Sequence, residues 1–122
     1  MELFNIIELG GYPDFSPLYK KNGFAVTTLT SMRKALRRIK QSVPDVIVAE
    51  FNFQSDFRDR TSNLESLMAV LQPYPEVKTI IFYEQEYRHQ FDKILARFTI
   101  DYHFHYPIDA AKLALAVEAC VK

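Results

Sequence analysis

The sequence has little cysteine, little glycine and no net charge, and each shortage excludes a class of protein. The one cysteine, Cys120, rules out an internal disulfide, and we expect it to be a buried thiol in a reducing compartment. The three glycines include only the pair Gly10-Gly11, so no Gly-rich phosphate loop is present. Because 15 basic residues balance 15 acidic ones, the whole molecule exerts no long-range pull on nucleic acid or anionic lipid.

Long apolar runs are also missing. None approaches the roughly 20 residues that cross a bilayer, and Met1 to Leu9 lacks the basic start and cleavage pattern of a secretory signal. The expected location is therefore cytoplasmic, without a membrane partner. With 48% hydrophobic and 25% charged residues, we expect residues 1–122 to form a single domain. We expect no enzyme activity, because the sequence has no recognisable nucleophile elbow, catalytic carboxylate pair or arrangement of Cys and His.

Short apolar runs alternate with amphipathic segments along the chain. Strands are predicted at 3–9, 24–29, 45–51, 77–83 and 101–106. Helices are predicted between these strands. Ser16 is the expected N-cap of a short first helix, and Thr30 or Ser31 that of the second. The third helix has apolar positions at Leu64, Leu67, Met68 and Leu71, the fourth covers residues 87–98, and Pro107 opens the last, which reaches Val121.

This alternation predicts a parallel sheet with helices on both faces, in the α/β class. In such sheets the working site lies beyond the carboxyl ends of the strands. Those ends are marked here by Glu8, Glu50, Tyr83 and Tyr106.

Two segments resemble response-regulator receiver domains. Residues 44–50 (PDVIVAE) resemble their third strand, in which Pro-Asp and aliphatic residues precede the phosphorylated aspartate, and Glu50 occupies that aspartate's place. Residues 106–109 (YPID) resemble the end of the fifth strand, with Tyr106 where the family has lysine. Asn52 also matches a position that is often Asn in the family.

The resemblance implies a CheY-like fold and a degenerate site. The implied fold is a (βα)5 flavodoxin-like, doubly wound, five-stranded parallel sheet of order 2-1-3-4-5. The implied phosphoacceptor pocket has these residues: Glu8, Glu50, Asn52, Tyr83 and Tyr106.

Departures from the family pattern indicate that phosphotransfer is very slow or absent. The family's acidic pair for Mg²⁺ is reduced to Glu8, and the Ser or Thr that ends the fourth strand is replaced by Tyr83 or Phe82. Without the lysine, no cation remains to neutralise charge on the phosphoryl oxygens. Glu8 and Glu50 are weak candidates for Mg²⁺, and we expect no cofactor.

Two interpretations of Glu50 stay open. Its carboxylate either holds the domain in one fixed conformation, as in a pseudo-receiver, or points into water at a strand end. Glu50 is one methylene longer than Asp, which moves its carboxylate about 1.5 Å outward, and shifts of ~1 Å can cost on the order of a hundredfold in rate. In a sharper version, Tyr106 or Tyr83 donates a hydrogen bond to Glu50; the alternative is that both pack at the rim.

Three further groups of residues have both a functional and an ordinary explanation. His103 and His105, on one face of a strand, and His89 lack companions for a metal site. The resemblance implies a weakened or pH-sensitive switch at His103, because receivers carry near this position an aromatic residue that moves on activation. The second helix has a basic face that either is solvated or meets nucleic acid or an acidic protein. The loop with Phe51, Phe53, Phe57, Arg58 and Arg60 is either a contact surface or a satellite core.

The favoured prediction is an atypical receiver domain that acts in signal transduction by protein contact. The resemblance implies an optional homodimer through the fourth helix, fifth strand and fifth helix, with nucleic acid an unlikely partner. Its candidate residues are Tyr87, Arg88, Phe91, Arg97, Tyr102 and Lys112. The alternatives are an authentic phosphorelay receiver with an unusual site and a flavodoxin-like domain that binds a small anion or nucleotide.

Overall fold

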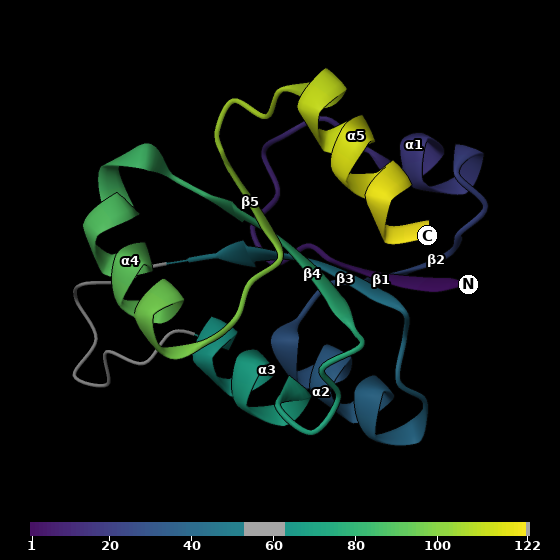
Figure 1. Cartoon of the computed structure of the whole chain (residues 1–122), viewed down its shortest axis with the longest axis horizontal. Helices are drawn as coiled ribbons and strands as arrows, with labels where there is room; N and C mark the ends of the chain where they lie inside the picture. Colours follow the sequence, from purple (N-terminus) through teal and green to yellow (C-terminus); the bar gives the residue numbers. More distant parts are fainter. Residues whose placement is uncertain (53–62, 122) are drawn as a thin grey trace.

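A computed structural model describes residues 1–52 and 63–121. Strands and helices alternate along this part of the chain (Figure 1). The strands are β1 (Glu2–Ile6), β2 (Ala25–Leu29), β3 (Val46–Phe51), β4 (Lys78–Tyr83) and β5 (Tyr102–His105). The helices are α1 (Ser16–Lys21), α2 (Met32–Gln41), α3 (Asn63–Leu71), α4 (Arg88–Arg97) and α5 (Ala110–Val121), with a 3₁₀ turn η1 (Gln85–Tyr87) before α4.

The five strands form one parallel sheet of order β2-β1-β3-β4-β5, which confirms the predicted topology. All six residues of β3 are buried, as its continuous aliphatic run predicted for a strand covered on both faces. The neighbouring ends of β3 and β4 are in register, so Glu50 lies opposite Phe82 and Phe51 opposite Tyr83. The carboxyl ends of these strands therefore meet at one edge of the sheet.

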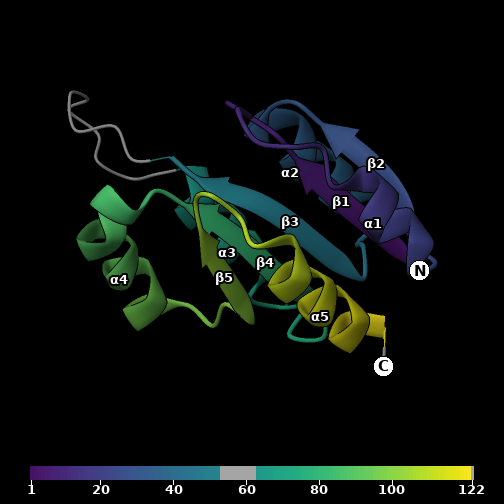
Figure 2. The same cartoon turned by 90° about the horizontal axis from the view of Figure 1, so that it is seen from above.

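Helices cover both faces of the sheet (Figures 1 and 2). One face carries α1 and α5 over an apolar cluster that includes Phe82 and Leu113. The other carries α2, α3 and α4 over a cluster that includes Leu67, Tyr83 and Phe91. Because side chains alternate along a strand, the adjacent residues Phe82 and Tyr83 enter different clusters.

The predicted caps were right for α2 and wrong for α1 and α5. Ser31 Oγ accepts a hydrogen bond of 3.2 Å from the Lys34 N–H, as an N-cap does. At α1, Ser16 is already helical, and its N–H donates to Asp14 Oδ1 instead. Pro107 does not open α5, which begins at Ala110.

The physical reason at α5 is a better cap downstream of the proline. Asp109 Oδ1 accepts from the N–H groups of Ala111 (3.0 Å) and Lys112 (3.3 Å), which are free at a helix start. Strand ends also shifted: β1 ends at Ile6, so Glu8 lies in the following loop and not at the strand end as predicted.

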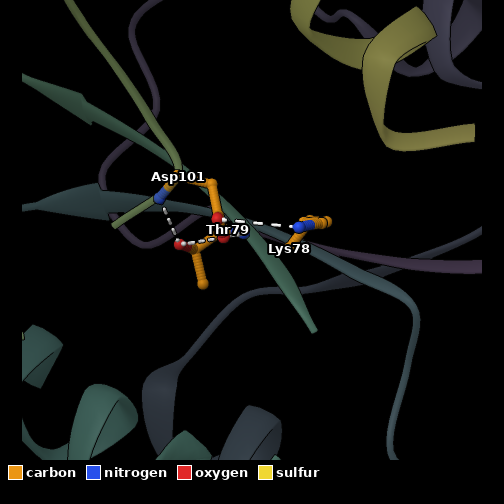
Figure 3. A network of polar contacts seen from close by, with 3 residues as sticks. All are labelled: Lys78, Thr79 and Asp101. Carbon is orange, nitrogen blue, oxygen red and sulfur yellow. Dashed lines mark hydrogen bonds and ion pairs between the residues drawn. The ribbon is translucent and has the colours of Figure 1, made fainter. Parts of the chain in front are cut away.

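A polar cluster fixes the beginning of the edge strand β5 to β4 (Figure 3). Asp101 Oδ2 accepts from the Thr79 N–H at 2.9 Å, and the Asp101 N–H donates to Thr79 Oγ1 at 3.1 Å. Lys78 Nζ lies 3.9 Å from Asp101 Oδ1. Thr79 is buried, so these bonds satisfy polar atoms that would otherwise be costly to enclose.

The structure bears on two predictions, the lack of a membrane-spanning segment and the burial of Cys120. Within residues 1–52 and 63–121, no helix has the length and apolar character needed to cross a membrane. Cys120 is buried, as predicted, and burial raises the pKa of its thiol to about 11.

Candidate functional site

The Glu50 side chain does not point into water. It is 2% exposed, and its carboxylate is held by backbone N–H groups of the loop that follows β1. Glu50 Oε1 accepts from Glu8 (2.6 Å) and Leu9 (3.2 Å), and Oε2 accepts from Gly10 (3.1 Å). Three N–H donors converge on one buried carboxylate, which supplies the compensation that a buried charge needs.

Local conformation explains why this loop can surround a carboxylate. Gly10 has φ +73°, a left-handed conformation that L side chains rarely adopt. It lets the chain turn sharply after β1, so that consecutive N–H groups face β3 rather than continuing the ladder. The extra methylene of Glu50 carries its carboxylate towards them from the end of β3.

Aromatic rings cover the other side of Glu50. The Tyr106 hydroxyl donates to Glu50 Oε2 at 3.5 Å, a long bond at the limit of the range. Tyr106 stacks on Tyr12 at 5.5 Å between centroids, and Tyr12 meets Phe82 edge-on at 5.3 Å. Burial, followed by the negative charge of Glu50, raises the pKa of both tyrosines, so they stay neutral donors at physiological pH.

A shallow hollow of about 360 Å³ opens over this group. Its described lining consists of these residues: Leu9, Gly10, Glu50, Phe51, Asn52, Glu84, Glu86, Tyr87 and Tyr106. Among these described residues are acids and neutral side chains but neither lysine nor arginine.

The structure brings together four of the five predicted pocket residues, with one correction. Asn52 is half-buried on the hollow's wall, Tyr106 reaches Glu50, and Glu8 contributes through its backbone N–H. Tyr83, which was expected to be able to donate to Glu50, faces the α4 side. Its hydroxyl accepts from Arg88 Nη1, and its ring stacks on Phe91 with centroids 4.5 Å apart.

The positions matched to the family's magnesium ligands hold Glu8 and Glu50. Both oxygens of Glu50 already accept N–H donors, and the position after Glu8 is Leu9, whose side chain is 71% exposed. Hard cations require carboxylate oxygens free to coordinate them. Across residues 1–52 and 63–121, no group of three His, Cys, Asp or Glu residues could hold a metal ion.

The two histidines of β5 lie on the α4 face together, as predicted. Tyr83 contacts the rings of His103 (5.8 Å) and His105 (6.1 Å), while His89 is exposed on α4. Burial, together with the positive charge of Arg88, lowers the pKa of His103. His103 Nδ1 is buried and has no hydrogen-bond partner among the described atoms.

The interface candidates divide into exposed and inward-facing residues. Phe91 was wrong as a surface residue: it is fully buried and packs on Phe51 at 5.4 Å. Its position on α4 points it towards the sheet because apolar residues at helical spacing face the core. Arg88 pairs with Asp92, and Arg97 pairs with Glu65 of α3. The remaining candidates are surface or half-buried: Tyr87, Tyr102 and Lys112.

The aromatic loop predicted as a contact surface falls mostly outside the described residues. Phe53, Phe57, Arg58 and Arg60 lie there, and Phe51 is buried in the core rather than on the surface.

Solved structures of receiver domains are similar to this chain. The receiver domain of NtrX from Brucella abortus superposes with a TM-score of 0.76 at 15% identity, covering 98% of this chain and 97% of that one. A response regulator receiver domain protein from Clostridium thermocellum gives 0.75 at 15%, covering 99% and 94%. The chain has the receiver fold. No family model and no curated protein sequence matches it.

In this receiver fold, the group around Glu50 lies at the edge where receivers carry their phosphoacceptor. The likeness extends over almost the whole chain, including the sheet order and the helix on each crossover. At these identities it concerns the fold alone.

Sequence reasoning missed the groups that matter most to Glu50. The backbone N–H groups of Glu8, Leu9 and Gly10 leave no side-chain signal, although Gly10-Gly11 marked the turn. Tyr12 was also missed, because its contacts with Phe82 and Tyr106 join distant segments. Glu84 and Glu86 follow β4 directly, and that position could have suggested them.

Proposed function

We propose that this chain is a receiver-like signalling domain that acts by binding a protein partner and no longer accepts a phosphoryl group. The observation that carries the proposal is the Glu50 carboxylate, whose oxygens accept three backbone N–H groups. An acceptor carboxylate must instead attack phosphorus with a free oxygen, beside a cation that neutralises the transferred group. Glu50 has neither.

The same contacts support a fixed conformation. Glu50 connects the end of β3 to the loop after β1, and Tyr106 of the segment after β5 closes over it. Protein groups alone thereby connect three parts of the strand-end edge. A permanent carboxylate at this place makes the state of the edge independent of phosphorylation and of Mg²⁺.

The experiment is exposure of the purified protein to acetyl phosphate with Mg²⁺, and separately to beryllofluoride with Mg²⁺. We expect no increase in intact mass and no change in melting temperature. A receiver domain with its aspartate and lysine intact serves as the positive control. A phosphoryl adduct mapped to Glu50 by peptide mass spectrometry would contradict the proposal and favour the authentic phosphorelay receiver.

The contact face shared by α4, β5 and α5 is proposed for the partner or for a second copy of the chain. Lys112 is exposed on α5, and Arg88 and Tyr102 are half-buried on α4 and β5. Arginine and tyrosine are enriched at protein interfaces. Light scattering across a concentration series should show a dimer that Lys112→Glu weakens; a monomer at every concentration would remove the homodimer.

A further inference from the structure

The distribution of positive charge on α2 destabilises the helix. This helix carries five cations and no acidic residue, in a chain of zero net charge. Arg33 and Lys34 occupy its first turn, where the helix dipole disfavours positive charge. Arg33 with Arg37 and Lys34 with Arg38 are like charges at i, i+4, which repel.

No acidic side chain offsets this repulsion within the described residues. The ion pairs found there join Lys78 to Asp101, Arg88 to Asp92 and Arg97 to Glu65, and none involves α2. All five cations of α2 are exposed: Arg33, Lys34, Arg37, Arg38 and Lys40. The cations of the first turn and the like-charged i, i+4 pairs therefore lower the stability of the helix, and no ion pair with another described residue compensates for them.

Three of these cations border a hollow between α2 and α3. The hollow measures about 450 Å³, and α2 and α3 lie beside each other on one face of the sheet (Figure 1). Its apolar lining consists of the buried Met32 and the partly exposed Leu36, and Ser66 of α3 also lines it. Its charged border has these residues: Arg33, Arg37 and Lys40. Their spacing of four and three residues places them on one side of the helix.

We propose that the groove between α2 and α3 binds an acidic, amphipathic segment of a protein partner. Carboxylates of that segment pair with Arg33, Arg37 and Lys40, while its apolar side chains cover Leu36. An amphipathic helix in a groove is a common mode of peptide recognition. This inference deepens the proposed binding function by giving the partner's chemistry, and it rests on that function but not on the state of Glu50.

The apolar lining favours a protein segment over nucleic acid. A phosphate backbone has no group that would gain from covering the partly exposed Leu36. Nucleic-acid-binding domains also carry an overall excess of positive charge, whereas this chain has none. The positive charge available to a partner in the groove is therefore confined to Arg33, Arg37 and Lys40, which extend over about two helical turns and so match a peptide of that length.

The helix supplies its own matched control. Arg33 and Arg37 border the groove, whereas Lys34 and Arg38, at the same spacing and one residue further on, do not. The double variants Arg33→Glu/Arg37→Glu and Lys34→Glu/Arg38→Glu change the net charge equally. Each also places one glutamate in the first turn, which the helix dipole favours. Circular dichroism of both variants verifies that they fold.

The test is fluorescence anisotropy with a synthetic helical peptide that has leucine on one face and glutamate beside it. We expect saturable binding that weakens about tenfold in Arg33→Glu/Arg37→Glu, since reversal turns two attractions into repulsions. Lys34→Glu/Arg38→Glu should stay within about twofold of the wild type. A peptide with glutamine in place of glutamate should bind about tenfold more weakly.

Three results would overturn this inference: no saturable binding of the glutamate peptide, equal weakening by both double variants, or tighter binding of a duplex DNA oligonucleotide than of the peptide. The acetyl phosphate experiment does not involve α2. A phosphoryl adduct on Glu50 would therefore defeat the loss of phosphotransfer while leaving this groove to be judged by the peptide alone.

Discussion

The burial of Glu50 is the central fact at the scale of single residues. An unpaired carboxylate in the interior costs several kcal/mol, so it persists only with donors of good geometry. Here the donors are backbone N–H groups, which every substitution except proline retains. The length of the side chain and the charge of its carboxylate should therefore both matter.

Glu50→Gln and Glu50→Asp should each lower the free energy of unfolding by about 2 kcal/mol, because a buried donor left without its charged acceptor costs ~1–3 kcal/mol. Glutamine keeps the length but replaces one acceptor oxygen with a donor. Aspartate keeps the charge but falls about 1.5 Å short. Urea denaturation measures both losses.

Glu84→Gln is the matched control for these variants, since Glu84 lines the same hollow but is exposed. It should change the unfolding free energy by no more than about 0.5 kcal/mol. If the two Glu50 variants were as stable as this control, the carboxylate would not be holding the loop.

His103 should make stability depend on pH. Its folded pKa is lowered by burial and by Arg88, with Asp92 opposing, so below the unfolded pKa of about 6.5 the unfolded chain binds a proton that the folded chain resists. The stability is thus complete above that value and falls as pH decreases through the window beneath it. Chemical denaturation at a series of pH values measures the slope.

His103→Phe should flatten this slope, because phenylalanine keeps a ring against Tyr83 and Phe91 but does not titrate. His89→Gln, at an exposed position, should leave the slope unchanged. An unaltered slope in His103→Phe would assign the pH dependence to other groups.

At the scale of elements, α2 shows how one cap supports an otherwise unfavourable helix. Ser31 Oγ satisfies the Lys34 N–H at a terminus that lacks acidic residues. Met32, Ala35 and Ile39 bury the opposite side against the sheet. Packing and the cap together hold the helix in spite of repulsion among its cations.

Ser31→Ala should destabilise the protein by about 1 kcal/mol, the usual cost of removing an N-cap oxygen. Thr30→Ala is the control, since Thr30 is exposed and the cap bond comes from its neighbour. Thermal or urea denaturation compares the two variants. Equal losses, or a larger loss at Thr30, would contradict the assignment of the cap.

At the scale of the whole molecule, one sheet connects two apolar clusters. Leu67 belongs to the cluster under α2, α3 and α4, and Leu113 to the cluster under α1 and α5. Both clusters draw side chains from the same strands, because successive residues of a strand face opposite sides. If the helices of one face separated from the sheet, they would expose the strands on which the other face also packs.

Leu67→Ala and Leu113→Ala should therefore shift the same unfolding transition to a lower midpoint, and each should lower the free energy of unfolding by about 2–5 kcal/mol, as for a fully buried leucine. Far-ultraviolet circular dichroism and tyrosine fluorescence should give coincident curves, as in two-state unfolding. A separate early transition in only one variant would mean that the two faces unfold independently.

The sequence determined the class of fold and most of the elements. Apolar runs such as 45–51 predicted buried strands, and helical spacing predicted Leu64, Leu67 and Met68 as core residues, all confirmed. These patterns are local, since the side-chain period of a strand or helix follows from backbone geometry alone. Even the errors at Ser16 and Pro107 concern only where a helix begins.

Tertiary structure decided what surrounds Glu50. The sequence identified its position, but the donors that hold it are N–H groups about 40 residues away, which no side-chain pattern encodes. It also decided that Tyr106 faces Glu50 whereas Tyr83 faces Arg88. The reason is that an interaction between distant segments depends on the turn of a loop and on the face each strand presents, and both are fixed only when the sheet and its helices pack together.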